Sequence, residues 1–116
     1  MNWTRQHDAW IARECEGLEV RALDLSPSGE PCAFWVWSLD KPNHLVSSYN
    51  TDPAACIRAA EAWRRKGKLR IVRLSLHSRG CSARLYDGLN WINEGPHTEP
   101  AAALAQAFYR ATGGPA

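Results

Sequence analysis

The sequence predicts an α+β fold in which helices cover both faces of a four-stranded, mainly antiparallel sheet, a three-layer α/β/α sandwich. Amphipathic helical patterns open, divide and close the chain, and two pairs of strand-like segments lie between them. One of these strands is apolar on both alternations, as a strand covered on both faces is. The predicted element order is αββαββα. A chain of 116 residues has the size of one domain, so we expect a single domain over residues 1–116, with an ordered core over about 4–112.

Composition excludes several classes of protein. Hydrophobic residues make up 45% and charged residues 22%, which excludes a disordered or collagen-like chain. No apolar run approaches the roughly 20 residues that a membrane span needs, and the first residues do not resemble a signal peptide. We therefore expect a cytoplasmic protein without a membrane partner.

In the first half, a helix is predicted over about Arg5–Glu16, because apolar residues recur on one face and Gly17 suits its end. A strand follows over about Leu18–Leu25, and residues 26–31 form a polar loop. The segment Cys32–Trp37 is the strongest strand pattern and carries Trp35 and Trp37 on one alternation. We expect it to be central, with helices above and below.

In the second half, Asp52 or Thr51 is expected to cap a helix that starts near Pro53 and ends at Gly67. Its predicted core stripe is Cys56, Ile57, Ala60 and Trp63. Segments Leu69–His77 and Cys81–Asp87 read as a hairpin joined by residues 78–80. Residues 89–92 are interpreted as a short strand extension or a packed loop. A final helix is predicted over about Glu99–Thr112, capped by Thr98.

The sequence offers little evidence of catalysis. Its four cysteines (Cys15, Cys32, Cys56 and Cys81) are too widely spaced for a typical zinc site, so we expect buried or half-buried free thiols. The glycines form neither a P-loop nor a dinucleotide fingerprint, and the histidines form no metal motif. A nucleophile assembled from distant residues stays open. The prediction is a protein that is not an enzyme and that uses no cofactor or metal.

The charge distribution is uneven although the net charge is only +2. Residues 58–84 hold nine basic side chains and one acidic side chain, a local charge of +8. Such a segment favours anionic partners. The alternative is a solvated helix end together with a sheet edge that lysine and arginine protect from pairing.

Strand alternation places a polar set within this segment. Arg73, Ser75 and His77 share one face of their strand, and Ser82, Arg84 and Tyr86 share one face of the next. If the register brings the two faces together, arginines can hold a phosphate and aromatic rings can stack on a base. The predicted ligand-binding residues are Arg73, Ser75, His77, Arg84, Tyr86 and Trp91. The alternative is an exposed half-sheet that carries ordinary polar residues.

Three short motifs resemble those of the phage ABA sandwich domain family. They are Tyr49–Ala55 at the start of the second helix, Thr98–Ala103 at the start of the alanine-rich final helix, and Ala12–Gly17 at the end of the first. The resemblance implies a tailed-phage or prophage protein, in the host cytoplasm, with a sheet between helical layers. It implies no catalytic residue.

We therefore expect a small phage accessory protein that acts as a binding module, with an anionic nucleotide signal of host defence as its ligand. One alternative is a nucleic-acid-binding protein that uses the same basic segment. Another is a protein-interaction module that docks a host enzyme through Trp3 or Trp91. A concave pocket shared between the subunits of a homo-oligomer favours the nucleotide, whereas a continuous flat basic surface favours a polymer.

Overall fold

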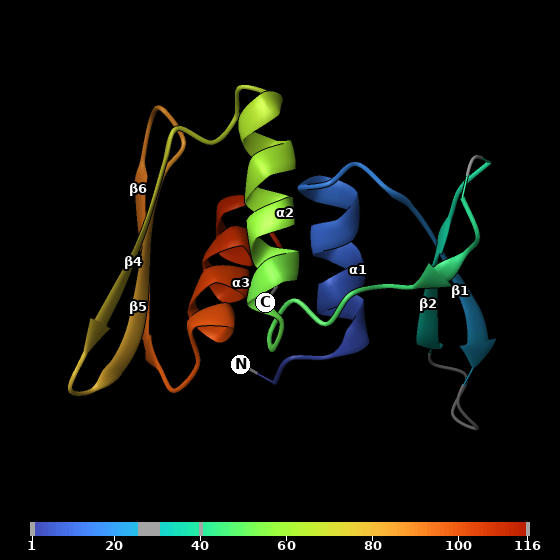
Figure 1. Ribbon diagram of the computed structural model, residues 1–116, viewed down its shortest axis with the longest axis horizontal. Coiled ribbons are helices and arrows are strands. Elements are labelled where there is room, and N and C mark those ends of the chain that lie inside the picture. The colour runs from blue at the N-terminus through green and yellow to red at the C-terminus, as the bar shows by residue number, and fades with distance from the viewer. Residues whose placement is uncertain (1, 26–30, 40, 116) are drawn as a thin grey trace.

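The computed structural model describes residues 2–25, 31–39 and 41–115, and the side chains at 23–25, 31 and 32 lie outside that description. Its elements follow the order αβββαβββα (Figure 1). The helices are α1 (Arg5–Glu14), α2 (Pro53–Arg65) and α3 (Pro100–Ala111). The strands are β1 (Glu19–Leu25), β2 (Pro31–Trp37), β3 (His44–Leu45), β4 (Ile71–His77), β5 (Gly80–Tyr86) and β6 (Trp91–His97).

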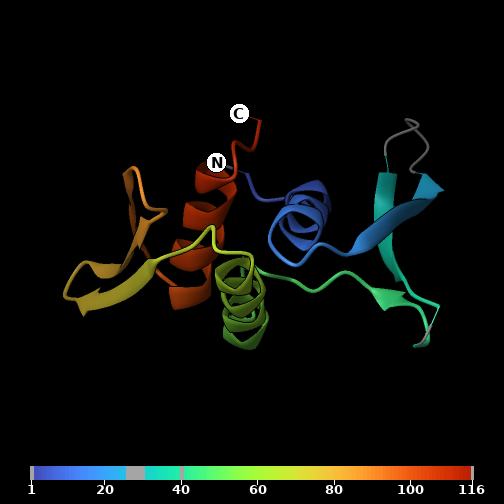
Figure 2. The same cartoon turned by 90° about the horizontal axis from the view of Figure 1, so that it is seen from above.

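The α+β class is confirmed, but the predicted layer order is wrong. The strands form two separate three-stranded antiparallel sheets, β1-β2-β3 and β4-β5-β6, in place of one four-stranded sheet. Figures 1 and 2 show the helices between the two sheets. Each sheet therefore buries one face against helices and leaves the other open, an arrangement that antiparallel sheets tolerate.

The expectation that β2 is covered on both faces is also wrong. Phe34 and Val36 are buried toward α1, whereas Trp35 and Trp37 lie half-buried on the opposite face. The guanidinium of Arg21 stands 4.3 Å from the centre of the Trp37 ring. This contact partly covers the ring, which explains how an apolar side chain persists on an open face.

Helix α3 explains why the helices form the central layer. Every residue of Ala101–Tyr109 is buried, so this helix is covered all round. It packs against β5 and β6 on one side and against α1 and α2 elsewhere. Its alanines let neighbouring elements approach on several sides.

The predicted helix boundaries hold to within a few residues, with two corrections to detail. Asp52 caps α2 as expected by accepting a hydrogen bond from the Ala54 backbone N–H at 3.0 Å. Glu99, not Thr98, is the N-cap residue of α3. Ile57, expected in the core, is 62% exposed on α2.

Two strands were not predicted as such. The short β3 pairs with β2, and β6 extends the predicted hairpin into a three-stranded sheet through pairs such as Tyr86 with Trp91. Of residues 89–92, expected to form a short strand extension or a packed loop, the last two begin β6, which runs on to His97.

One continuous apolar core joins both sheets through the helical layer. Among its largest fully buried side chains are Tyr49, Leu85 and Phe108. Cys15, Cys56 and Cys81 are free and buried, as predicted, while the side chain of Cys32 lies outside the described part. Burial raises the pKa of both Cys15 and Cys56 to about 12.

Candidate functional site

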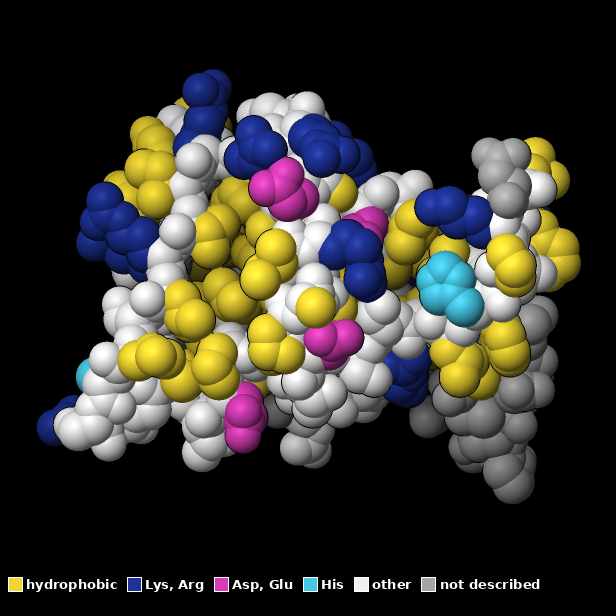
Figure 3. Space-filling model, viewed as in Figure 1, with side chains coloured by type: hydrophobic (Ala, Val, Ile, Leu, Met, Phe, Trp, Pro, Cys, Tyr) yellow, Lys and Arg dark blue, Asp and Glu magenta, His cyan; other side chains and the backbone are white. Residues whose placement is uncertain are grey.

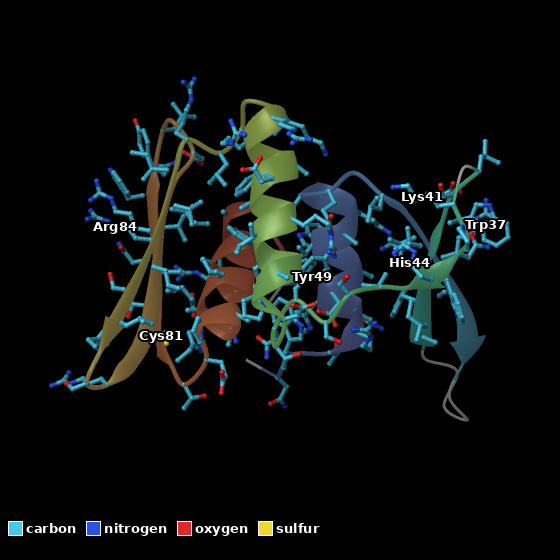
Figure 4. All side chains as sticks on the ribbon, in the orientation of Figure 1. Trp37, Lys41, His44, Tyr49, Cys81 and Arg84 are labelled. Carbon is cyan, nitrogen blue, oxygen red and sulfur yellow. The ribbon has the colours of Figure 1, made fainter. Side chains whose placement is uncertain are left out.

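The candidate site is the outward face of the β4-β5-β6 sheet, which we call the open face. The register places Arg73 opposite Arg84, Ser75 opposite Ser82, and Tyr86 opposite Trp91. The alternate residues of β5, among them Ala83 and Leu85, point inward and are buried against the helices. Figure 4 shows Arg84 directed away from the helical layer.

The structure brings all six predicted ligand-binding residues onto this one face. Arg73, Ser75 and His77 follow one another along β4, Arg84 and Tyr86 lie on β5, and Trp91 begins β6. His77 also contacts Ser82 across the strands, with 2.9 Å between its Nε2 and the serine Oγ. Their role in binding a ligand stays a prediction.

An aromatic platform occupies one end of the open face. The Tyr86 and Trp91 rings are stacked, with centroids 4.9 Å apart and planes inclined by 28°. The Tyr86 hydroxyl donates a hydrogen bond to the Gly88 carbonyl at 2.9 Å, which fixes the phenol in place. Trp91 remains 40% exposed, so the platform is open to solvent.

Two arginine side chains lie over the indole ring of Trp91. The Cζ atom of Arg84 lies 4.2 Å from the centre of the indole ring, and that of Arg73 lies 5.9 Å away. Neither arginine forms an ion pair with any carboxylate of the described residues. Both charges therefore remain available to an anion, while the indole orients them.

A hollow of about 320 Å³ lies beside this platform. The residues that line it are Ser75, Ser82, Ala83, Arg84, Asn93, Glu94 and Gly95. A side chain at Gly95 would enter this space, since a Cβ there would stand 2.8 Å from the Ser82 Oγ. The hollow therefore presents hydroxyl, amide and guanidinium groups close to one another, and its one carboxylate, Glu94, is paired with Arg110 and His97.

Asn93 and Gly95 are site residues that sequence reasoning missed. Both lie on β6, which was not recognised as a strand. The alternation of Trp91 and Asn93 with the inward Ile92 was the signal that could have placed them.

The open face is basic because its one neighbouring carboxylate is turned inward and paired. Glu94 accepts hydrogen bonds from Arg110 at 2.7 Å and His97 at 2.9 Å. The remaining strand residues on the outward face, all within the described part, include no aspartate or glutamate. By contrast, Arg58 and Arg64 of the basic segment pair with Glu16 and Glu61. Some basic residues of the segment 58–84 are therefore used in ion pairs within the fold, whereas Arg73 and Arg84 on the open face form none with the described residues.

A larger hollow, about 380 Å³, lies between α1, β2 and the end of α3. Its walls include His7, Trp10 and Tyr109, whose side chains also contact one another within an aromatic cluster. Arg13 is its one basic residue other than histidine, and that side chain already donates to the Val20 carbonyl at 3.2 Å. The open face therefore offers the denser set of ligand-binding groups.

We also searched the described residues for a metal site and for a membrane-spanning helix. Within residues 2–25, 31–39 and 41–115, no three His, Cys, Asp or Glu side chains gather as metal ligands would. The helices of that same part are too short or too polar to cross a bilayer. Comparison with family models, curated proteins and solved structures finds no match to the chain.

Proposed function

We propose that this chain is a non-enzymatic binding module that holds single-stranded nucleic acid on the open face of β4-β5-β6. The observation that carries the proposal is the stack of Tyr86 and Trp91 with Arg84 over the indole. Aromatic side chains on an antiparallel sheet are a common platform for unpaired bases, and arginines beside them bind the phosphates.

The shape of the surface favours a strand over a single nucleotide. The open face continues across three paired strands with Arg73 and Arg84 near its middle, whereas the hollow beside them is small for a ligand pocket. The serines and Asn93 then serve as hydrogen-bond partners for the sugar and phosphate groups of successive nucleotides. A small phage or prophage protein in a host cytoplasm, as the sequence resemblance implies, would meet single-stranded nucleic acid there.

The hollow supports a second candidate, the sequestering of an anionic nucleotide signal of host defence. It gathers Ser75, Ser82, Arg84 and Asn93 within about 320 Å³. The two candidates share the phosphate-binding arginines and differ in the length of ligand that fills the surface.

Fluorescence anisotropy with fluorescein-labelled ten-nucleotide RNA and DNA strands tests the proposal. We expect Trp91→Ala to weaken binding about 5- to 150-fold, because loss of one base–aromatic stack costs about 1–3 kcal/mol. We expect Arg84→Ala to weaken binding and to lower the salt dependence by about one released ion.

Trp37→Ala is the matched control. Trp37 also lies under an arginine on an open sheet face, with Arg21 4.3 Å from its ring, but on the other sheet. Its loss should change affinity less than twofold. Equal losses for Trp37→Ala and Trp91→Ala, or no binding of any strand, would refute the proposal. Tighter binding of cyclic or linear nucleotides than of the strands would support the second candidate.

A further inference from the structure

We propose that the groove between α2 and β4 binds an extended, acidic, amphipathic peptide of a partner protein, which adds as a fourth strand at the free edge of β4. This site lies on the inward side and the edge of the sheet. It adjoins the open face at Arg73 but does not depend on the function proposed for that face.

Ile57 and Val72 line this groove, and the exposed apolar row continues past it along β4 with Leu74 and Leu76. Leu76 is 71% exposed and Ile57 is 62% exposed, and Val72 and Leu74 are exposed between them. These are four of the eight large apolar residues exposed in the described part of the chain. Concentration of such side chains at one place is typical of an interaction surface.

The arrangement of the helices leaves this surface uncovered. Val72, Leu74 and Leu76 alternate on the inward side of β4, the side that faces the helical layer. Helix α3 covers mainly β5 and β6, while α2 stands beside β4 without closing over it (Figure 2). The inward row of β4 is therefore apolar but lacks the helical cover that Ala83 and Leu85 have on β5.

The result is a groove of about 290 Å³ with apolar walls and a charged rim. Ile57, Ala60, Leu69 and Val72 form the walls, and Arg64 and Arg70 are at the rim with Glu61. Figure 3 shows the hydrophobic surface between the sheet and α2, with basic side chains above it. An apolar side chain of a partner could enter this space from the solvent.

Strand β4 also offers backbone hydrogen bonds. It is the first strand in the order β4-β5-β6 and pairs with β5 alone over all seven of its residues. The opposite edge presents backbone N–H and C=O groups to solvent, as every edge strand does. A peptide strand bound there would lie about 4.8 Å from β4 and continue the sheet.

Charge complementarity selects an acidic partner. Glu61, the acidic residue of the rim, is already paired with Arg64 at 2.8 Å and Arg65 at 3.8 Å. Arg70 has no carboxylate partner among the described residues, and Lys68 lies close to it in the chain. A second copy of this chain would bring the same positive charges against one another, so like-charge repulsion disfavours self-association here.

The alternation of β4 sets the pattern of the peptide. Side chains of the added strand that point inward meet the row of Val72, Leu74 and Leu76, so they should be apolar. Those that point outward lie beside Arg73, so acidic residues suit them. The expected ligand alternates apolar and acidic residues over about seven positions, the length of β4.

A synthetic peptide tests this inference on the intact chain. The probe is a fluorescein-labelled nine-residue peptide of alternating glutamate and valine, and its companion has lysine in place of every glutamate. We expect the acidic peptide to bind at least 10-fold more tightly in fluorescence anisotropy and to slow hydrogen exchange of the β4 amides. Proline in place of two valines should abolish binding, because proline cannot donate to the sheet.

Leu76→Glu should weaken binding of the acidic peptide at least 10-fold, whereas Leu39→Glu should leave it unchanged. Leu39 is 98% exposed and lies beyond the end of β2, far from the groove in sequence and structure. Circular dichroism should show that both variants are folded, because both leucines are exposed.

Three outcomes would overturn the inference. The first is no binding, or equal binding of the glutamate and lysine peptides. The second is a concentration-dependent dimer in sedimentation that Leu76→Glu dissolves, which would assign the groove to a second copy of the chain. The third is loss of oligonucleotide binding in Leu76→Glu but not in Trp91→Ala, which would assign the groove to nucleic acid.

Discussion

Glu94 is the side chain that fastens β6 to α3. Arg110 donates to one of its oxygens at 2.7 Å and also to the Asn93 carbonyl at 2.6 Å, while His97 contacts its other oxygen. The carboxylate is mostly buried, with 16% of its side chain exposed. Burial by itself would raise the pKa of Glu94, but the hydrogen bonds from Arg110 and His97 outweigh it and hold that pKa below its ordinary value of 4.5.

Glu94→Gln should therefore lower the free energy of unfolding by about 1–3 kcal/mol at neutral pH. A carboxyl whose pKa is lower in the folded state stabilises the protein above the unfolded pKa, and this contribution is lost as the pH falls through the folded pKa. The difference between wild type and variant should be full above pH 4.5 and shrink below it. Urea denaturation at pH 7 and at pH 3 measures it.

The matched control for this variant is Glu19→Gln. Glu19 also pairs with an arginine, at 2.8 Å from Arg21, but 58% of its side chain is exposed. An exposed pair contributes little, so this substitution should change stability by less than about 0.5 kcal/mol. Equal effects of the two substitutions would show that Glu94 does not hold β6 in place.

The conformation of strand β6 requires glycine at position 95. Gly95 has φ +126°, and a Cβ there would lie 2.8 Å from the Cys81 carbonyl oxygen and 2.9 Å from the Ser82 Cα. The neighbouring pairs shift register between Cys81 and Ala83, so β6 bulges at this point. Because the crowding atoms belong to backbone, the strand would have to move to admit a methyl group.

Gly95→Ala should thus destabilise the protein by about 2–3 kcal/mol, from strain together with displacement of the strand. Gly113→Ala is the comparison, since Gly113 has φ +77° but nothing within 4 Å of its would-be Cβ. Its cost should be only about 1 kcal/mol. Thermal unfolding of the two variants checks the difference, and equal melting temperatures would contradict the crowding at Gly95.

The same strand shows what a sequence alone could predict. The outward alternation of Arg73, Arg84 and Tyr86 could be predicted, because period-two patterns follow from strand geometry alone. In Trp91–His97 this signal covers only the first residues, since Gly95 and Pro96 interrupt the pattern and disfavour strands. Asn93 and Gly95 were consequently missed as parts of the candidate site.

The layer order was predicted wrongly because both β2 and α3 are apolar on more than one side, and only one of them is buried on all sides. Trp35 and Trp37 indicated a strand buried on both faces. In the structure both lie half-buried on an open face, where Arg21 covers part of the Trp37 ring. The better signal was α3, where Ala102 and Ala103 make the side away from Leu104 and Phe108 apolar as well. A helix apolar all round belongs in the central layer. Propensity and periodicity thus predicted the helices and strands. The order of the layers depended on which faces are buried against a neighbouring element.

At the scale of the whole molecule, the helical layer and its common core connect the two sheets. Three buried thiols report on different parts of that core: Cys15 follows α1, Cys56 lies in α2 and Cys81 lies in β5. The Cys56 thiol contacts the Tyr49 carbonyl at 3.0 Å and that of Ala101 at 3.6 Å, so it spans the loop before α2 and the start of α3. Opening of any one layer would expose its own cysteine first.

We expect all three thiols to become reactive in one transition, because a single continuous core should unfold cooperatively. In a Cys32→Ser background, Ellman's reagent at pH 8 should leave them unmodified in the native state. A pKa of about 12 keeps Cys15 and Cys56 almost wholly protonated, with a thiolate fraction of roughly 1 in 10,000. Across a urea series, mass spectrometry should find the same midpoint for modification of each cysteine. Modification of Cys81 at lower urea than Cys15 and Cys56 would instead show that β4-β5-β6 detaches by itself, and the sheet that carries the open face would then be an independent unit.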